Sequence, residues 1–361
     1  MNVTSLIRYQ MNKIIYRLLI VLLVFCTIAC QNKNTPKQNK LEVIASSDKQ
    51  WTGVAVDQTG RIFVNYPKWS DDVPMSVAEI VNGKPVVYPN KDWNNTVNTE
   101  SFVAVQSVVV DKKNRLWILD TRNPLFKGVM EGGPLLYQFN LESNQKEKVY
   151  QFLEGEYKPN SYFNDVRIDT DNEIAYMTDS GDGAIITLDL NTGTSRRLLD
   201  QHPSTNSEVN YLICNGERWE NSVHSDGIAL SPDNEYLYYI ALTGHTLYRI
   251  NTGDLLNKDL TNEALATKVE TVKTIPATDG MLFDKSGNLW LGGLENNSIN
   301  KINTKGDLTS VVQDSSIRWA DSFAEDQTGN IYFTTSQIHL PNERRGSYEV
   351  IRFDPKNLKS K

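Results

Sequence analysis

The sequence lacks the features on which many enzyme classes depend. Its 361 residues include three cysteines and four histidines. The HExxH, GxSxG, GxGxxG, P-loop and CxxC patterns are all absent, so zincin, α/β-hydrolase, dinucleotide-binding and nucleotide triphosphate-binding functions lack support. After residue 30, no stretch keeps apolar residues at spacings of three and four over the length of a helix. This absence disfavours helical solenoids.

Positive charge is also scarce. The chain carries 37 Lys and Arg residues against 44 Asp and Glu residues, a formal net charge of −7. Residues 1–30 contain three basic residues and no acidic ones, so the rest of the chain has 34 basic against 44 acidic residues, or −10. Because nucleic acid binding needs a basic surface, we expect no nucleic acid partner.

The first thirty residues have the pattern of an export signal. Three basic residues precede an apolar run over residues 18–29, which is as long as a signal-peptide core and short for a membrane span. The run ends in the sequence TIAC, which resembles the lipobox of bacterial lipoproteins, although Thr27 stands where leucine is usual. The resemblance implies cleavage before Cys30 and acylation of that cysteine. An ordinary secretory signal is the alternative.

The residues after Cys30 predict how the domain is attached. Residues 31–40 are polar and are expected to form a flexible tether to the folded domain over residues 41–361. We expect an exported bacterial lipoprotein that contacts a membrane through its lipid anchor alone, in the outer membrane or at the cell surface or periplasm. Gln31 is not the acidic residue associated with inner-membrane retention. An acylated Cys30 leaves no pair for a structural disulfide, and Cys214 is expected to be buried as a small apolar residue.

A short phrase returns six times along the chain. Each copy has a polar residue, an alternating apolar run, a turn usually with Gly or Asn and an aromatic second run, as in TGVAVDQTGRIFV and DGMLFDKSGNLWL. Alternation is typical of half-buried strands, and Gly and Asn suit tight hairpins. A third strand follows in every copy and a fourth in four copies. Four antiparallel strands repeated every roughly 42 to 62 residues predict propeller blades.

The repeats predict an all-β fold, a six-bladed β-propeller of four-stranded antiparallel blades that forms one domain over residues 41–361. The sixth copy leaves only residues 355–361 for its outer strand. Residues 41–46 precede the first copy and can supply that strand instead. We therefore expect the N-terminal strand to join the last blade, which closes the ring and removes two exposed strand edges.

The polar residues that open the six copies are the strongest functional candidates. Because the first strand of each blade lines the channel, these side chains are expected to meet at one mouth: Thr52, Gln106, Asn164, Asp226, Asp279 and Asp321. Three carboxylates and two amides require a positive counter-charge, because like charges raise each other's pKa. Ca²⁺ or Mg²⁺, an organic amine, or Lys and Arg from the loops would supply it. The alternative is that each Asp caps a turn.

This ring defines the predicted site. The expected ligand-binding residues are Gln106, Asn164, Asp226, Asp279 and Asp321. Candidates for acid or base catalysis are Asp226, Asp279 and His224, and candidates for metal binding are Asn164, Asp226 and Asp279. Aromatic residues enter the blades at the same mouth: Tyr157, Tyr162, Phe163, Trp219 and Trp319. An acidic floor with aromatic walls suits a small cationic or aromatic ligand.

Several phrases resemble the major royal jelly protein and yellow family. The similarity spans residues 51–354 and is carried by VQSVVVDKKNRLWILDTRNP, YFNDVRIDTDNEIAYMTDSGDGAIITLDLNTG, HSDGIALSPDNEYLYYIALTGHTLYRI and TDGMLFDKSGNLWLGG. The resemblance implies a secreted six-bladed propeller with a central pocket, in a family associated with dopachrome conversion or with binding of biogenic amines. Both ligand types are small aromatic molecules, and an amine carries the positive charge that the acidic ring favours.

A more distant resemblance is to the SMP-30, gluconolactonase and regucalcin propellers. Their metal site takes a Glu from the first blade, an Asn from the fourth and an Asp from the fifth, and an Asn of the third blade binds substrate. This chain offers Asn164 in the third blade, Asp226 in place of the fourth-blade Asn, and Asp279 in the fifth. Thr52 and Gly53 stand where the Glu is expected, which weakens the implied Ca²⁺ or Mg²⁺ site, while Asp226 restores the charge.

Three classes of function therefore stay open. The first is a lipid-anchored propeller of the yellow type that binds a small aromatic or amine-bearing molecule and isomerises it as a dopachrome-type tautomerase. The second is a divalent-metal-dependent lactonase or esterase, in which the ion polarises the ester carbonyl. The third is a non-catalytic interaction scaffold.

Overall fold

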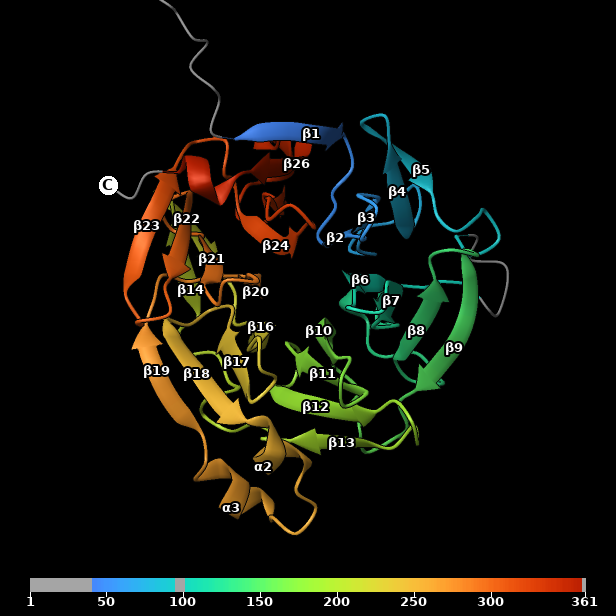
Figure 1. Cartoon of the computed structure of the whole chain (residues 1–361), viewed down its shortest axis with the longest axis vertical. Coiled ribbons are helices and arrows are strands. Elements are labelled where there is room, and N and C mark those ends of the chain that lie inside the picture. The colour runs from blue at the N-terminus through green and yellow to red at the C-terminus, as the bar shows by residue number, and fades with distance from the viewer. Residues whose placement is uncertain (1–40, 95–100, 359–361) are drawn as a thin grey trace, which may run out of the picture. The chain divides into compact units, whose positions relative to one another are not determined.

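The computed structural model describes residues 41–94 and 101–358. The predicted signal segment, the predicted lipidation site Cys30 and the predicted tether all fall in residues 1–40, outside the described residues. Within the described part, six antiparallel sheets have four strands each, and two further strands pair as a hairpin. Figure 1 shows the six sheets arranged in a ring around a common centre. The predicted six-bladed, all-β propeller is confirmed.

Each sheet is one blade, whose strands follow one another outward from the centre of the ring (Figure 1). Blade 1 contains β2 (Val54–Val56), β3 (Ile62–Asn65), β4 (Val77–Val81) and β5 (Lys84–Val87), and blade 2 contains β6 (Val105–Val110), β7 (Arg115–Asp120), β8 (Leu135–Asn140) and β9 (Gln145–Gln151). Blade 3 contains β10 (Phe163–Asp169), β11 (Ile174–Asp179), β12 (Ala184–Asp189) and β13 (Ser195–Leu198), and blade 4 contains β16 (Ser225–Leu230), β17 (Tyr236–Ala241), β18 (Thr246–Asn251) and β19 (Glu270–Thr274). Blade 5 contains β20 (Met281–Phe283), β21 (Leu289–Gly293), β22 (Ser298–Ile302) and β23 (Leu308–Gln313), and blade 6 contains β24 (Ala320–Glu325), β25 (Ile331–Thr335) and β26 (Tyr348–Phe353).

The outer strand of blade 6 comes from the other end of the domain. Strand β1 (Glu42–Ser47) pairs antiparallel with β26, from Glu42 opposite Arg352 to Ser47 opposite Tyr348. An ion pair of 2.6 Å between Arg352 and Glu42 supports the same register. The predicted closure by residues 41–46 is therefore confirmed. The two strands pair along edges that each would otherwise leave exposed.

In five of the six blades, the aspartate that ends the apolar run holds the hairpin that follows it, and Ser231 stands at this position in blade 4. Asp111 shows the pattern, because its Oδ1 accepts hydrogen bonds from the backbone N–H groups of Lys113 and Arg115 at 2.9 and 3.0 Å. Its Oδ2 accepts from the indole N–H of Trp117 at 2.8 Å. The same pair of interactions recurs in other blades, so the recurring Asp of the phrase stabilises a turn and fixes the aromatic residue of the second strand.

The apolar core lies between neighbouring blades. One cluster joins Trp117 and Leu119 of blade 2 with Phe163 and Val166 of blade 3, and all four side chains are at most 1% exposed. Burial of each such side chain contributes about 1.5–3 kcal/mol relative to an exposed one. The blades are therefore held side by side, and the starts of their first strands are brought into one ring.

Several short elements were absent from the sequence-based expectation. Besides β5, these are the hairpin of β14 (Tyr211–Cys214) and β15 (Glu217–Glu220), the helices α2 (Thr252–Leu256) and α3 (Asn262–Ala266), and the 3-10 turns η1 (Pro124–Phe126), η2 (Asn342–Arg344) and η3 (Pro355–Asn357). Each helix has five residues and begins at a side-chain cap, Asn251 for α2 and Thr261 for α3. Helices of this length are too short to produce an apolar period. Among the described residues, no helix has the length and apolar character to cross a bilayer.

Candidate functional site

Five of the six predicted ring residues line one cavity at the centre of the propeller, here called the central cavity. It has a volume of about 640 Å³, and its floor is formed by Gln106, Asn164, Asp226, Asp279 and Asp321. The sixth residue, Thr52, is 1% exposed and does not line the cavity. Its hydroxyl donates to the backbone carbonyl of Gln106 at 3.4 Å, so it connects blades 1 and 2 instead.

Irregular strand starts direct the floor residues into the cavity. The pairing of four first strands with their neighbours shifts register across the segments that hold Gln106, Asn164, Asp226 and Asp321. Such β-bulges change the direction of a side chain and are common beside functional sites. In the fifth blade, Asp279 precedes β20 and lies outside the regular pairing altogether.

Glycines beside two of the aspartates let the blades approach closely. A Cβ atom at Gly227 would lie 2.2 Å from the backbone oxygen of Asp279, and one at Gly280 would lie 2.1 Å from that of Asp321. Both distances are far below any real contact, so only glycine fits these positions. The Asp-Gly pairs of the sequence therefore have two roles, because the Asp faces the cavity while the Gly permits contact with the next blade.

A directional chain of hydrogen bonds runs along one side of the floor. The indole N–H of Trp69 donates to the hydroxyl oxygen of Tyr162 (2.7 Å), and the Tyr162 hydroxyl donates to Oε1 of Gln106 (2.9 Å). The Gln106 amide donates to Oδ1 of Asn164 (2.9 Å), and the Asn164 amide donates to Oδ2 of Asp226 (2.5 Å). Every donor in this series of hydrogen bonds points toward the acidic residues, so the series ends on a carboxyl oxygen.

The three aspartates of the floor form a buried group, here called the aspartate cluster. Their side chains are between 3 and 8% exposed. The carboxyl group of Asp279 interacts with that of Asp226, and the carboxyl group of Asp321 interacts with that of Asp279. Because buried like charges disfavour each other, the cluster favours the retention of a proton more than isolated aspartates do.

The electrostatics of the aspartate cluster follow from its burial and its like charges. Burial raises the pKa of Asp226, Asp279 and Asp321 well above the ordinary value, and the charge of a neighbouring aspartate raises each of these pKa values further. Asp165, which the sequence interpretation missed, adds to the repulsion and lies beside the cluster. The negative charge of Asp165 is compensated, because Asp165 accepts a hydrogen bond from the Ser107 hydroxyl at 2.7 Å and forms a 3.0 Å ion pair with Arg167.

Trp319 lies behind the floor and binds the middle carboxyl group. Its indole N–H donates to Oδ2 of Asp279 at 2.6 Å, and its ring is 0% exposed. It packs edge to face against Trp219, with ring centroids 5.0 Å apart, and stacks on His339. The backbone of Trp319 has a φ of +65°, which is unusual for a bulky residue and marks local strain.

The walls of the cavity are aromatic on two sides. Phe126 is stacked between Trp69 and Tyr162, with ring centroids 6.1 and 4.9 Å away. The Phe126 ring is 61% exposed, and both Leu125 and Phe126 have a positive φ. Trp219, from the hairpin of β14 and β15, lines the cavity as well. A flat aromatic ligand can stack on these surfaces.

The other predicted residues of this mouth have different positions. Tyr162 and Trp219 line the central cavity, whereas Tyr157, Phe163 and Trp319 do not. His224 is also absent from the lining, and its Nδ1 accepts a hydrogen bond from the backbone N–H of Ser207 at 3.0 Å. Burial lowers the pKa of His224. Of the sequence-based catalytic candidates, the structure therefore brings together Asp226 and Asp279 and leaves His224 outside.

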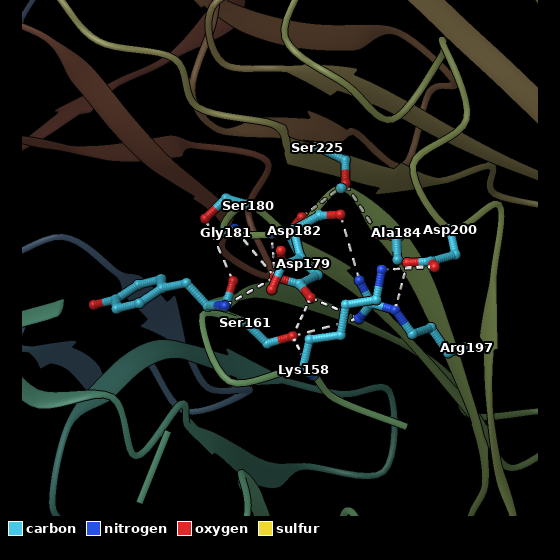
Figure 2. A network of polar contacts seen from close by, with 12 residues as sticks. Lys158, Ser161, Asp179, Ser180, Gly181, Asp182, Ala184, Arg197, Asp200 and Ser225 are labelled. Atoms are coloured by element: carbon cyan, nitrogen blue, oxygen red, sulfur yellow. Dashed lines mark hydrogen bonds and ion pairs between the residues drawn. The ribbon is translucent and has the colours of Figure 1, made fainter. Parts of the chain in front are cut away.

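A buried ion-pair network around Asp179 and Arg197, shown in Figure 2, holds the backbone of Tyr162 in place. Asp179, at the end of β11, is 0% exposed and forms a 2.6 Å ion pair with Arg197. It also accepts from the Ser161 hydroxyl at 2.5 Å and from the backbone N–H of Tyr162 at 2.8 Å. Arg197 forms a second ion pair of 2.7 Å with Asp200. The network thus fixes the segment that delivers Tyr162 to the floor, so Asp179 has a structural role.

The predicted metal ligands lie next to one another but are engaged with their neighbours. Oδ1 of Asn164 accepts from Gln106, while its amide nitrogen faces Asp226. Oδ2 of Asp279 accepts from the indole N–H of Trp319. Ca²⁺ or Mg²⁺ needs several oxygens directed at one point. Across residues 41–94 and 101–358, no group of three or more His, Cys, Asp or Glu side chains is arranged to hold a metal ion, so this geometry does not fit one.

The chain has known relatives in sequence. The family model described as major royal jelly protein matches residues 103–353, which contain blades 2 to 5, the three inner strands of blade 6 and all five floor residues. Major royal jelly protein 5 of Apis mellifera is 26% identical over 265 residues, covering 68% of this chain and 43% of that protein. Protein yellow of Drosophila guanche is 30% identical over 159 residues, covering 39% of this chain and 28% of that one. The matched regions span less than half the length of these curated relatives.

Solved structures share the architecture. A gluconolactonase from Xanthomonas campestris superimposes with a TM-score of 0.55 at 12% sequence identity, covering 86% of this chain and 88% of the other. At this identity the likeness concerns the fold alone. The extent of the family match, together with the repeated phrases that fold into blades, leads to one conclusion. The chain belongs to the major royal jelly protein and yellow family.

Proposed function

We propose that this protein binds a small aromatic or amine-bearing molecule in the central cavity and isomerises it in the manner of a dopachrome-type tautomerase. The observation that carries the proposal is the aspartate cluster, where buried carboxyl groups with raised pKa values lie together under aromatic walls. An ionised aspartate pairs with an ammonium group, and aromatic faces stack on a ring and attract cations.

The reaction class follows from the protons of the cluster. A tautomerisation removes a proton from one atom of the substrate and returns a proton to another, with no net gain or loss of electrons or atoms. An ionised carboxylate of the cluster accepts the first proton, and a neighbouring carboxyl group donates the second. Asp226 and Asp279 are the residues to which these roles are assigned, because burial and the neighbouring carboxylates raise the pKa of both groups and so favour a shared proton.

Direct binding and rate measurements test this function. Purified protein should bind a catecholamine or an indoleamine in calorimetry and should accelerate the conversion of dopachrome over buffer. Asp226→Asn and Asp279→Asn should each lower the rate by about a hundredfold, the usual contribution of general acid–base catalysis. Absence of both binding and acceleration in the wild-type protein would refute the proposal, and binding without acceleration would restrict it to a ligand-binding role.

Variants of the floor residues test the alternative of a non-catalytic interaction scaffold. Alanine at Asn164, Asp226 or Asp279 removes a floor side chain without changing the outer surface of the ring. A scaffold that uses its rim keeps its protein partner in all three variants, whereas a pocket protein loses its small ligand. Retention of dopamine affinity in all three variants would argue against a ligand on the cavity floor.

We also propose that the protein is exported and attached to a membrane by a lipid on Cys30. The support is the sequence pattern of residues 1–30 and the secreted character expected from the family resemblance. In a bacterial host, the wild-type protein should fractionate with membranes and incorporate labelled fatty acid, and Cys30→Ser should do neither. Equal distribution of the two proteins between the fractions would contradict the lipid anchor.

A further inference from the structure

Arg345 lines the central cavity as a cation with no carboxylate partner. Among the described residues, no Asp or Glu forms an ion pair with it within 4.0 Å. Its guanidinium group donates instead to neutral oxygens: the backbone carbonyls of Leu340 (2.7 Å) and Ile338 (3.3 Å) and Oε1 of Gln50 (3.4 Å). These bonds use three of its five N–H groups, so two remain for a ligand.

Two other cationic side chains near Arg345 form ion pairs with carboxylates. Lys49 lines the same cavity and forms an ion pair with Asp72. Arg344, next in sequence to Arg345, makes two parallel bonds of 2.7 and 2.8 Å to the carboxylate of Glu217. Lys49 and Arg344 are therefore paired with carboxylates, whereas Arg345, which lines the cavity, is not among the described ion pairs.

The loop that carries Arg345 is held in one conformation. The side-chain amide of Gln337 accepts from the backbone N–H of Gly346 at 2.9 Å and donates to the carbonyl of Ser347 at 3.0 Å. Gln337 is 1% exposed, so these bonds are shielded from water. The guanidinium group is thus placed before a ligand arrives, which lowers the entropic cost of binding.

We infer that Arg345 binds a carboxylate of the ligand, so that the central cavity selects aromatic amino acids and related aromatic carboxylic acids over the corresponding amines. The inference rests on the proposed function, because it names the substrate class of the same cavity. A planar carboxylate matches the two free N–H groups of a guanidinium. A dianion such as a phosphate ester is disfavoured, because one arginine faces three buried aspartates in this cavity.

A set of three ligands tests the selection in the wild-type protein. L-Tyrosine carries a carboxylate, its methyl ester keeps the amine and ring but masks the carboxylate, and tyramine lacks the group. We expect tyrosine to bind about tenfold more tightly than either of the others in calorimetry, the effect of one charge-assisted hydrogen-bonded pair. Equal affinity for all three would overturn the inference and leave the proposed function standing. Failure of all three, and of dopachrome, to bind would instead remove the proposed function.

Variants assign the effect to Arg345. Arg345→Gln should abolish the preference for tyrosine over its ester while leaving the affinity for tyramine unchanged within about twofold. Arg344→Gln is the matched control, because Arg344 is outside the cavity lining, and it should keep the preference. Arg345→Lys retains the charge and should keep part of the preference if the glutamine variant fails to fold. A preference that survives in a folded Arg345→Gln protein would refute the assignment.

Discussion

The indole N–H of Trp319 donates to Oδ2 of Asp279 across 2.6 Å, inside a region where both side chains are at most 8% exposed. This bond connects the strained backbone of Trp319, with φ at +65°, to the middle carboxyl group of the aspartate cluster. Burial raises the pKa of Asp279, Asp226 raises it further, and the bond from Trp319 opposes both effects. The indole thereby determines how much of the charge of the cluster resides on Asp279.

Removal of this indole N–H should affect both stability and function. In Trp319→Phe the aromatic packing against Trp219 is retained, but the hydrogen bond to Asp279 is lost. We expect the free energy of unfolding to fall by about 1–3 kcal/mol, and the rate or the affinity for dopamine to fall by about tenfold. Urea unfolding and calorimetry measure the two effects.

Trp290→Phe is the matched control for that variant. Trp290 is 1% exposed and donates to Oδ2 of Asp284 at 2.7 Å, but neither residue lines the central cavity. It should lose a similar free energy of unfolding and keep its affinity for dopamine. If both variants weaken the ligand equally, Trp319 has no specific role at the site.

The stability of the protein should depend on the protons of the aspartate cluster. Burial and the charge of Asp279 raise the pKa of Asp321 in the folded protein above its unfolded value of 3.8. The folded state therefore binds more protons than the unfolded state between these two pKa values. The stabilisation that Asp321 contributes is complete below pH 3.8 and is lost as the pH rises through the folded-state pKa.

The variant Asp321→Asn measures this loss. Because asparagine does not ionise, the free energy of unfolding of the variant minus that of the wild type should grow by about 1.4 kcal/mol for each pH unit inside the window. Melting curves from mildly acidic to mildly basic pH give the difference. A difference that stays constant over this range, or that falls with rising pH, would show that Asp321 is ionised as freely as an isolated aspartate.

The ion pair of Arg197 with Asp179 should be needed for folding. Its two side chains are 6 and 0% exposed, so Arg197→Met leaves an unpaired charge in the interior. We expect a loss of about 3–5 kcal/mol in the free energy of unfolding. Lys112→Met breaks a pair with Asp171 whose side chains are 59 and 65% exposed, and it should cost less than about 1 kcal/mol. Equal midpoints in urea for the two variants would contradict this account.

The exposed ring of Phe126 should contribute to ligand affinity alone. Phe126→Ala removes the central ring of the stack with Trp69 and Tyr162, and the lost stacking should weaken dopamine binding by roughly fivefold. Because the ring is 61% exposed, the melting temperature should hardly change. Leu153→Ala, at a residue that is 60% exposed and away from the cavity, is the control. Unchanged affinity in Phe126→Ala would remove this ring from the proposed binding surface.

Divalent cations distinguish the tautomerase proposal from the lactonase alternative. Oxygens of Asn164, Asp226 and Asp279 already accept hydrogen bonds from neighbouring N–H groups, so millimolar CaCl₂ or MgCl₂ should leave the melting temperature unchanged, and EDTA should do the same. A site filled at a hundred times its Kd would add about 2.7 kcal/mol of stability. A rise of that size, with lactone hydrolysis that EDTA abolishes, would favour the metal-dependent enzyme.

The fold was predictable because the same sequence pattern repeats in every blade. Alternating apolar residues and a capped turn occur in all six copies, so errors in one copy do not change the architecture. The missed elements have weak local signals. Strand β5 is four residues long, contains Pro85 and is half exposed, so its pairing with β4 comes from tertiary structure rather than from its own propensity.

The site was only partly predictable for a related reason. The floor residues share one position of the repeat, which places them around one mouth in any propeller. Trp69, Phe126 and Arg345 come from connections of irregular conformation, and no period indicates where such segments point. Asp165 was missed because a β-bulge, not the strand alternation, brings it beside the aspartate cluster.

The pairing of β1 with β26 has a consequence for biosynthesis. Ribosomes produce β1 before every other described strand and its partner after them, and the ion pair between Glu42 and Arg352 spans 310 residues of chain. Until β26 has been synthesised, the ring of blades is therefore open and two strand edges lack their partners. Such edges are templates for aggregation. Completion of the circle is the step that removes this hazard, and its large sequence separation makes it slow relative to the formation of single blades.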